Sequence, residues 1–214
     1  MYKTYKDIEN GIYNSPSLQD AWGGVGTSLK RYNICNFSIL LTQLHNEGNI
    51  VEIGVARGDC SKLIIENINE KYNLYLFDTF EGLPPSTKED LINDNVENSL
   101  SFSLDYVKNF IGNKKNVFYY KGLIENTYNN LPNNIILCHI DCDLYEGVYI
   151  SLKHVIPKLK IRGVIIIDDY KNDYYQGVKK ACEKIEEEYN IKINHFNIFC
   201  SEHYCQGIYV KNII

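Results

Sequence analysis

The 214-residue sequence has no apolar run near the roughly 18 residues that a membrane span requires, and no repeat of about 20 to 50 residues. Its opening segment, MYKTYKDIENGIY, lacks the apolar stretch of a secretion signal, and its seven irregularly spaced cysteines give no disulfide framework. Positive charge is not in excess, since the net charge is −5. These absences disfavour a membrane, exported or nucleic-acid-binding protein and favour a cytoplasmic one with small-molecule ligands.

From residue 34 onward, short apolar segments alternate with segments of helical period. Strands are expected from residue 49 and over 73–77, 117–122, 135–141 and 164–168, with helices over 34–44, from 59, and over 99–111, 146–156 and 174–189. Such alternation is typical of an α/β doubly wound, mostly parallel sheet. Residues 193–199 and 206–213 have strand character without a helix between them, so we expect a C-terminal antiparallel hairpin and seven strands in all.

Residues 1–33 are polar and contain three glycines beside the single tryptophan, Trp22. This composition fits a flexible arm or a lid over a binding site, and a loosely packed surface extension is equally compatible with it. The length of the chain suits one well-buried domain, which we assign to residues 34–214. The sequence leaves open whether the protein forms a homo-oligomer.

Acidic residues follow two of the expected strands directly. Asp141 and Asp143 end one apolar run, and Asp168 and Asp169 end the next. Ligand sites of open α/β sheets lie at the carboxyl ends of the strands, where these four carboxylates would repel one another. A hard divalent cation, Mg²⁺, Mn²⁺ or Ca²⁺, is the simplest way to neutralise them.

A glycine-containing turn follows the first strand and leads into a helix. Gly54 and Gly58 allow close approach of a ligand, and the helix beginning near Asp59 offers free N–H groups to an anion. Ala56 breaks the dinucleotide fingerprint, which disfavours a nicotinamide cofactor. Asp78, at the tip of the second strand, is placed to bind ribose hydroxyls. Together these features indicate a nucleoside-bearing cofactor, although the glycines alone fit a plain turn equally well.

Five motifs in order carry a resemblance to a known family: VEIGVARG, LFDTFEGLP, YKGLIENT, HIDCDLYEG and GVIIIDDY, which begin at residues 51, 76, 120, 139 and 163. With them the chain resembles the macrocin O-methyltransferase family, class I S-adenosylmethionine-dependent methyltransferases that methylate sugar hydroxyls of natural products. The resemblance implies a Rossmann-like sheet, S-adenosylmethionine and Mg²⁺ (or Mn²⁺) as cofactors, and a sugar or glycosylated metabolite as the acceptor.

The resemblance also implies roles for individual residues. The methionine end of the cofactor would contact Glu52, Gly54, Arg57 and Ser61, and its ribose would contact Asp78. Residues near the ribose or the adenine would be Thr79, Phe80, Lys121 and Gly122. The metal would be held by Asp141, Asp168 and Asp169, with Asp143 supporting the loop or the outer shell of the metal.

Methyl transfer to an alcohol requires a base that removes the hydroxyl proton. Catechol-type relatives carry a lysine three positions after the first metal aspartate, and Leu144 stands there in this sequence. We therefore expect Asp141 itself to be the base. His139, on the same face of a regular strand, is the second candidate, although a histidine in such a position is more often structural.

Other functions stay open from the sequence alone. A D-x-D pair at a strand end also holds Mn²⁺ and a sugar nucleotide in glycosyltransferases, and an inert S-adenosylmethionine-binding protein would share the cofactor loop. A phosphohydrolase fits less well, because its D-x-D strand comes early in the chain. Cys200 to Cys205 could form a soft metal site, but incidental cysteines explain this segment better.

Overall fold

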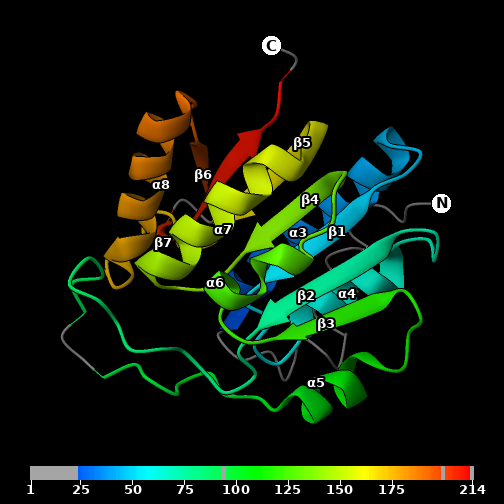
Figure 1. The fold of residues 1–214 in the computed structure, drawn as a ribbon, viewed down its shortest axis with the longest axis horizontal. Coiled ribbons are helices and arrows are strands. Elements are labelled where there is room, and N and C mark those ends of the chain that lie inside the picture. The colour runs from blue at the N-terminus through cyan, green and yellow to red at the C-terminus, as the bar shows by residue number, and fades with distance from the viewer. Residues whose placement is uncertain (1–23, 93–94, 199–200, 213–214) are drawn as a thin grey trace.

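A computed structural model describes residues 24–92, 95–198 and 201–212. Its centre is a seven-stranded sheet in the order β3-β2-β1-β4-β5-β7-β6 (Figure 1). The strands are β1 (Asn49–Ile53), β2 (Asn73–Asp78), β3 (Val117–Lys121), β4 (Ile135–Ile140), β5 (Leu159–Ile167), β6 (Asn194–Ile198) and β7 (Ser201–Val210). Strands β1 to β5 pair in parallel, whereas β7 pairs antiparallel with both β5 and β6. The expected doubly wound sheet with its C-terminal hairpin is confirmed.

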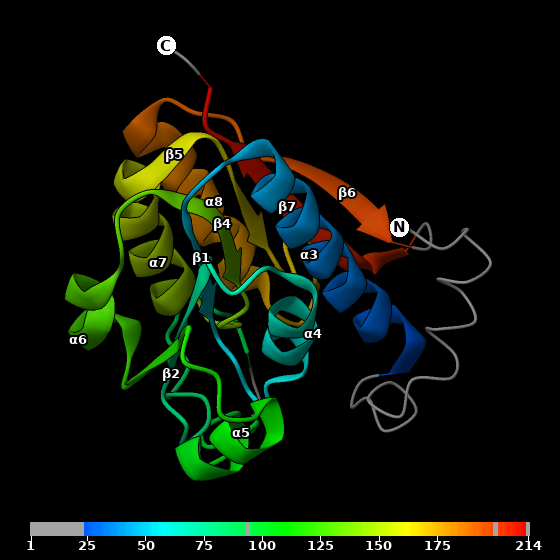
Figure 2. The same ribbon diagram turned by 90° about the vertical axis from the view of Figure 1, so that its right-hand side faces the viewer.

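Helices cover both faces of this sheet (Figure 2). Helices α3 (Gly24–Leu44), α4 (Asp59–Asn67) and α5 (Leu104–Ile111) contribute to one hydrophobic cluster. Helices α6 (Ile124–Thr127), α7 (Tyr145–Lys158) and α8 (Gln176–Tyr189) contribute to the other, with the 3-10 turn η1 (Tyr128–Asn130) after α6. Every residue of β4 is buried, as expected for a central strand covered on both faces. No helix in the described part of the chain is long and apolar enough to span a membrane.

Helix α3 runs across the boundary at residue 33 that the sequence indicates. It begins at Gly24, so residues 24–33 of the expected arm are helical and continuous with the helix expected from residue 34. α3 packs against α4, β4 and β7. The boundary at residue 33 therefore falls inside a packed helix, and the remaining arm, residues 1–23, lies outside the described residues.

The edges of several elements differ from the expectations. Strand β5 begins at Leu159, directly after α7, rather than at 164, because a register shift against β4 accommodates Arg162 at φ 64°. Residues 124–130 form α6 and η1, which the sequence analysis did not anticipate. Part of the expected hairpin loop belongs to β7, while Cys200, one member of the candidate soft metal site, lies outside the described residues.

The turn after β1 approaches the end of β4 very closely. Gly54 has φ 87°, and a Cβ atom built on it would lie 1.9 Å from the carbonyl oxygen of Asp141. Any side chain at this position would collide with backbone. Glycine thus lets the β1 turn and the acidic end of β4 meet.

Candidate active site

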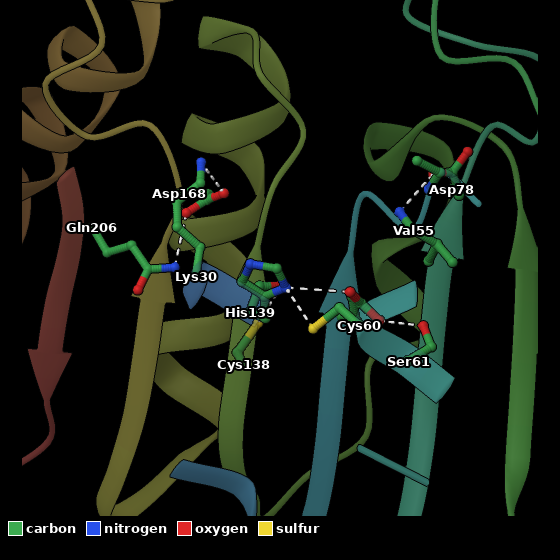
Figure 3. Close-up of polar contacts among 11 residues, drawn as sticks. Lys30, Val55, Cys60, Ser61, Asp78, Cys138, His139, Asp168 and Gln206 are labelled. Carbon is green, nitrogen blue, oxygen red and sulfur yellow. Dashed lines mark hydrogen bonds and ion pairs between the residues drawn. The ribbon is translucent and has the colours of Figure 1, made fainter. Parts of the chain in front are cut away.

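The acid cluster predicted from the sequence forms at the carboxyl ends of β4 and β5. Asp168 and Asp169 are buried. The ammonium of Lys30, from α3, lies 2.5 Å from Asp168 Oδ2 (Figure 3) and 3.0 Å from Asp169 Oδ1. The side-chain amide of Gln206 on β7 donates to Asp168 Oδ1 at 2.8 Å. Two elements remote in sequence, α3 and β7, therefore hold the Asp168 carboxylate at the end of β5.

The carboxyl groups of the cluster have unequal affinities for protons. Burial raises the pKa of Asp168, but the charges of Lys30 and His139 and the hydrogen bonds from Lys30 and Gln206 outweigh it and lower this pKa overall. Burial and the charge of Asp168 raise the pKa of Asp141 to about 7, against the opposing effects of His139 and Lys30. Burial and neighbouring carboxylates also raise the pKa of Asp143 and Asp169. Asp168 is thus the carboxylate that stays ionised most readily.

His139 lies between the acid cluster and the β1 strand. Its Nδ1 atom is 3.2 Å from Glu52 Oε1, and Glu52 also accepts a hydrogen bond from Ser61. Burial lowers the pKa of His139, but the bond to Glu52 and the charges of Asp141 and Asp168 raise it overall. Its buried Nε2 atom has no hydrogen-bond partner among the residues that the structure describes.

The donor atoms fit a hard divalent ion. Potential ligand atoms of Asp141, Asp143 and Asp169 lie within 4.8 Å of one another, and so do those of His139, Asp141 and Asp168. Carboxylate oxygens dominate both sets, which suits Mg²⁺ or Mn²⁺. Two of the three predicted ligands, Asp168 and Asp169, are at the same time paired with Lys30.

A cavity of about 440 Å³ opens beside the cluster at the ends of β1, β2 and β4. Its lining includes Gly54, Asp78, Thr79, Gly122 and Asp141. The Asp78 carboxylate accepts hydrogen bonds from N–H groups of the β1 turn, at 2.6 Å from Val55 (Figure 3) and 3.0 Å from Ala56, and a third from the N–H of Phe80 at 2.6 Å. Asp78 therefore fixes the turn as well as facing the cavity.

A smaller cavity of about 40 Å³ lies on the other side of the β1 turn. It is lined by Arg31, Glu52, Gly54, Val55, Ala56, Arg57, Asp59, Cys60, Phe102 and Asp141. Arg57 pairs with Asp59 at the start of α4, with its Nη2 atom 2.6 Å from Asp59 Oδ1. The buried Nη1 atom of Arg31 has no hydrogen-bond partner among the described residues. Asp141, Gly54 and Ala56 line both cavities, so the β1 turn and the end of β4 separate them.

The profile of the macrocin-O-methyltransferase (TylF) family matches residues 26–204. The chain belongs to this family. Demethyldecarbamoylnovobiocin O-methyltransferase of Streptomyces niveus is 24% identical in an alignment of 163 residues, and the match covers 69% of this chain and 60% of that protein. The match thus spans 60% of the length of this curated relative.

Two solved structures share the fold of this family member. The O-methyltransferase NovP is 20% identical with a TM-score of 0.71, over 89% of this chain and 81% of that one. The calicheamicin methyltransferase CalS11 is 18% identical with a TM-score of 0.65, over 97% and 93% of the two chains. Both likenesses show the fold alone.

Three residues that the family resemblance assigns to the cofactor lie outside the linings of both cavities. Ser61 is buried against Glu52, and Phe80 is buried beside Tyr119. Lys121 pairs with Glu81, with Nζ 2.6 Å from Oε1, on the surface of this family member. The structure thus brings Glu52, Gly54, Arg57, Asp78, Thr79 and Gly122 to the cavities directly and the other three to their surroundings.

Three residues that shape the site have no clear signal in the sequence. Lys30 and Arg31 come from the segment read as an arm, and Asp90 comes from the long connection after β2. Asp90 is buried, lines the larger cavity and accepts the backbone N–H of Tyr145 at 2.6 Å and that of Thr87 at 2.7 Å. Adjacent basic residues in an otherwise polar segment were the only available signal for Lys30 and Arg31, and they are common on exposed helices.

Proposed function

We propose that this TylF-family chain transfers a methyl group from S-adenosylmethionine to a hydroxyl group of a sugar or sugar-bearing small molecule, with Mg²⁺ or Mn²⁺ held by Asp141, Asp168 and Asp169. The observation that carries the proposal is the position of Asp141. This residue lines both cavities beside the β1 turn and belongs to the acid cluster. Asp141 therefore belongs both to the proposed cofactor pocket and to the acid cluster that would activate the acceptor hydroxyl.

The two cavities divide the recognition of the cofactor. Asp78, Thr79 and Gly122 in the larger cavity would contact the nucleoside, with a carboxylate for ribose hydroxyls. Glu52 and Arg57 around the smaller cavity would contact the amino-acid end, with Ser61 holding Glu52 in place. Phe80 and Lys121 would support the loops beside the nucleoside. Bound S-adenosylmethionine supplies an electrophilic methyl group.

Arg31 completes this set. The methionine portion of S-adenosylmethionine ends in a carboxylate, and the unpaired Nη1 atom of Arg31 is a donor at the cavity where that portion would lie. A guanidinium binds carboxylates through charge-assisted hydrogen bonds. Arg31 would therefore hold the carboxylate, while Glu52 and Asp141 on the same cavity would face the positively charged amino group.

Asp141 is the proposed base. A carboxylate with a pKa of about 7 is a stronger base than an ordinary aspartate, and a substantial fraction of it is still ionised near neutral pH. His139 has a raised pKa and an Nδ1 atom engaged with Glu52, so its role is to place positive charge beside Asp141 rather than to take the proton. A divalent ion at the acid cluster would orient the acceptor hydroxyl and lower its pKa.

Ligand-dependent melting tests the proposal against the other functions. S-adenosylhomocysteine should raise the melting temperature of the purified protein, since a ligand that binds only the folded state stabilises it. A UDP-sugar with Mn²⁺ should stabilise the protein less than S-adenosylhomocysteine does, since it could bind only as an acceptor. The reverse pattern would replace the proposal by a D-x-D glycosyltransferase.

A further inference from the structure

Lys30 is a buried cation in the site where the proposed function requires a divalent one. Its side chain is 8% exposed, and its Nζ atom contacts carboxylates on two successive residues at the end of β5. Lysine is rarely buried without partners, and this one has two. The contact with Asp169 spans 139 positions of sequence, so the folding of α3 onto the sheet creates it.

The carboxylate oxygens that Lys30 contacts have few other partners. Asp168 uses Oδ2 for Lys30 and Oδ1 for Gln206. Asp169 uses Oδ1 for Lys30 and for the side-chain amide of Asn172 at 3.1 Å. The Lys30 ammonium therefore contacts Oδ2 of Asp168, which is the oxygen that does not accept from Gln206 and that a metal ion would otherwise bind.

We propose that Lys30 is the built-in counter-ion of Asp168 and Asp169, and that a divalent ion binds these carboxylates only when the Lys30 ammonium moves away. The inference deepens the proposed function and rests on its metal site. Two cations at the same buried oxygens repel each other strongly, because the attraction and repulsion of charges are little screened in the interior. The lysine and the ion are thus alternative occupants.

This competition couples the metal to α3. The Lys30 side chain is anchored on a helix that packs on α4, β4 and β7. Withdrawal of the ammonium removes the contact that ties this part of α3 to the end of β5. Arg31, the next residue, lines the smaller cavity, so the same helix contacts both the metal site and the cofactor site.

The affinity of the full chain for Mn²⁺, measured by electron paramagnetic resonance without cofactor or acceptor, tests the competition. Lys30→Met should bind Mn²⁺ about tenfold or more tightly than the wild type, because no ammonium has to be displaced. Lys179→Met removes a lysine from the exposed face of α8 and should leave the affinity unchanged. Equal affinity of Lys30→Met and the wild type overturns the proposal.

Hydrogen exchange of the wild type distinguishes displacement of the Lys30 ammonium by the metal ion from repulsion of the ion by an ammonium that stays in place. Mn²⁺ should reduce the protection of backbone amides in the α3 turn around residue 30, because that turn loses its tether. Unchanged protection at saturating Mn²⁺ overturns the proposal, and this result stands even if Lys30→Met fails to fold without metal. Neither measurement involves methyl transfer, so failure of the competition is distinguishable from failure of the proposed function.

Discussion

Arg31 and Asp78 stand at opposite ends of the proposed cofactor site, and two ligands can separate their roles. S-adenosylhomocysteine carries the amino-acid end, whereas 5′-methylthioadenosine lacks it. Arg31→Met should weaken binding of the first ligand about tenfold and leave the second unchanged, because only the first has a carboxylate for Nη1.

Asp78→Ala provides the matched comparison. It should weaken both ligands by about 10- to 100-fold, since both contain the ribose and the substitution also removes the acceptor for the Val55 and Ala56 N–H groups. Calorimetric titration of both variants measures the pattern. Loss of methylthioadenosine binding in Arg31→Met would place that residue elsewhere in the site.

Individual residues also show what the sequence could reveal. Asp78, Asp141 and Asp168 could be found because each follows a strand-length apolar run, and parallel strands bring their carboxyl ends to one edge. Lys30 could not be found in this way, because the helical spacing of apolar residues does not indicate which remote strand the polar side chains of that helix contact. The charge of the cluster was predictable, but its partner on α3 was not.

At the scale of elements, the packing of the unexpected α6–η1 segment on α7 depends on a stacked pair. The rings of Tyr128 and His154 lie 3.8 Å apart and nearly parallel, with an interplanar angle of 14°. Burial, with the charges of Lys153 and Lys158, lowers the pKa of His154 below its ordinary value of 6.5. Protonation therefore occurs more readily in the unfolded chain than in the folded one.

This difference predicts a pH dependence of stability. A group whose pKa is lowered by folding stabilises the fold above its unfolded pKa, so the contribution of His154 should be lost as the pH falls below 6.5. Between about pH 8 and pH 5 the melting temperature of the wild type should fall more than that of His154→Phe. Parallel curves for the two proteins would show that His154 titrates alike in both states.

Element boundaries were less predictable than element types. The continuous apolar pattern revealed β4 and the end of β5, but the start of β5 depends on a shift against β4 that places Arg162 at positive φ. The Tyr- and Asn-rich composition before residue 34 concealed a helix whose stability comes from packing of Ile34 and Leu41 in the core. The start of β5 and the extent of α3 both depend on tertiary contacts, which cannot be read from local composition.

At the scale of the whole molecule, the residues assigned to the site lie together at the carboxyl ends of the parallel strands. Residues from α3, from the ends of β1, β2, β4 and β5, and from β7 converge there, while the opposite ends of the strands contribute none of the residues assigned to the site. The order of motifs along the chain was enough to predict this convergence, because a doubly wound sheet aligns its strands in one direction. The identity of the acceptor depends on the shape of its binding site, which the order of motifs does not encode.

The most direct test of the account uses methyl-labelled S-adenosylmethionine with a panel of sugar nucleotides and glycosylated small molecules, and mass spectrometry to detect the transferred methyl group. The wild type should label an acceptor hydroxyl, and Asp173→Asn, an exposed neighbour of the acid cluster, should do the same. Asp141→Asn should lose about 10²- to 10⁴-fold in rate while still binding S-adenosylhomocysteine, because an amide cannot take the proton. Full-rate transfer by Asp141→Asn would contradict the assignment of the base. Binding of S-adenosylhomocysteine by the wild type without labelling of any acceptor hydroxyl would contradict the proposed reaction itself.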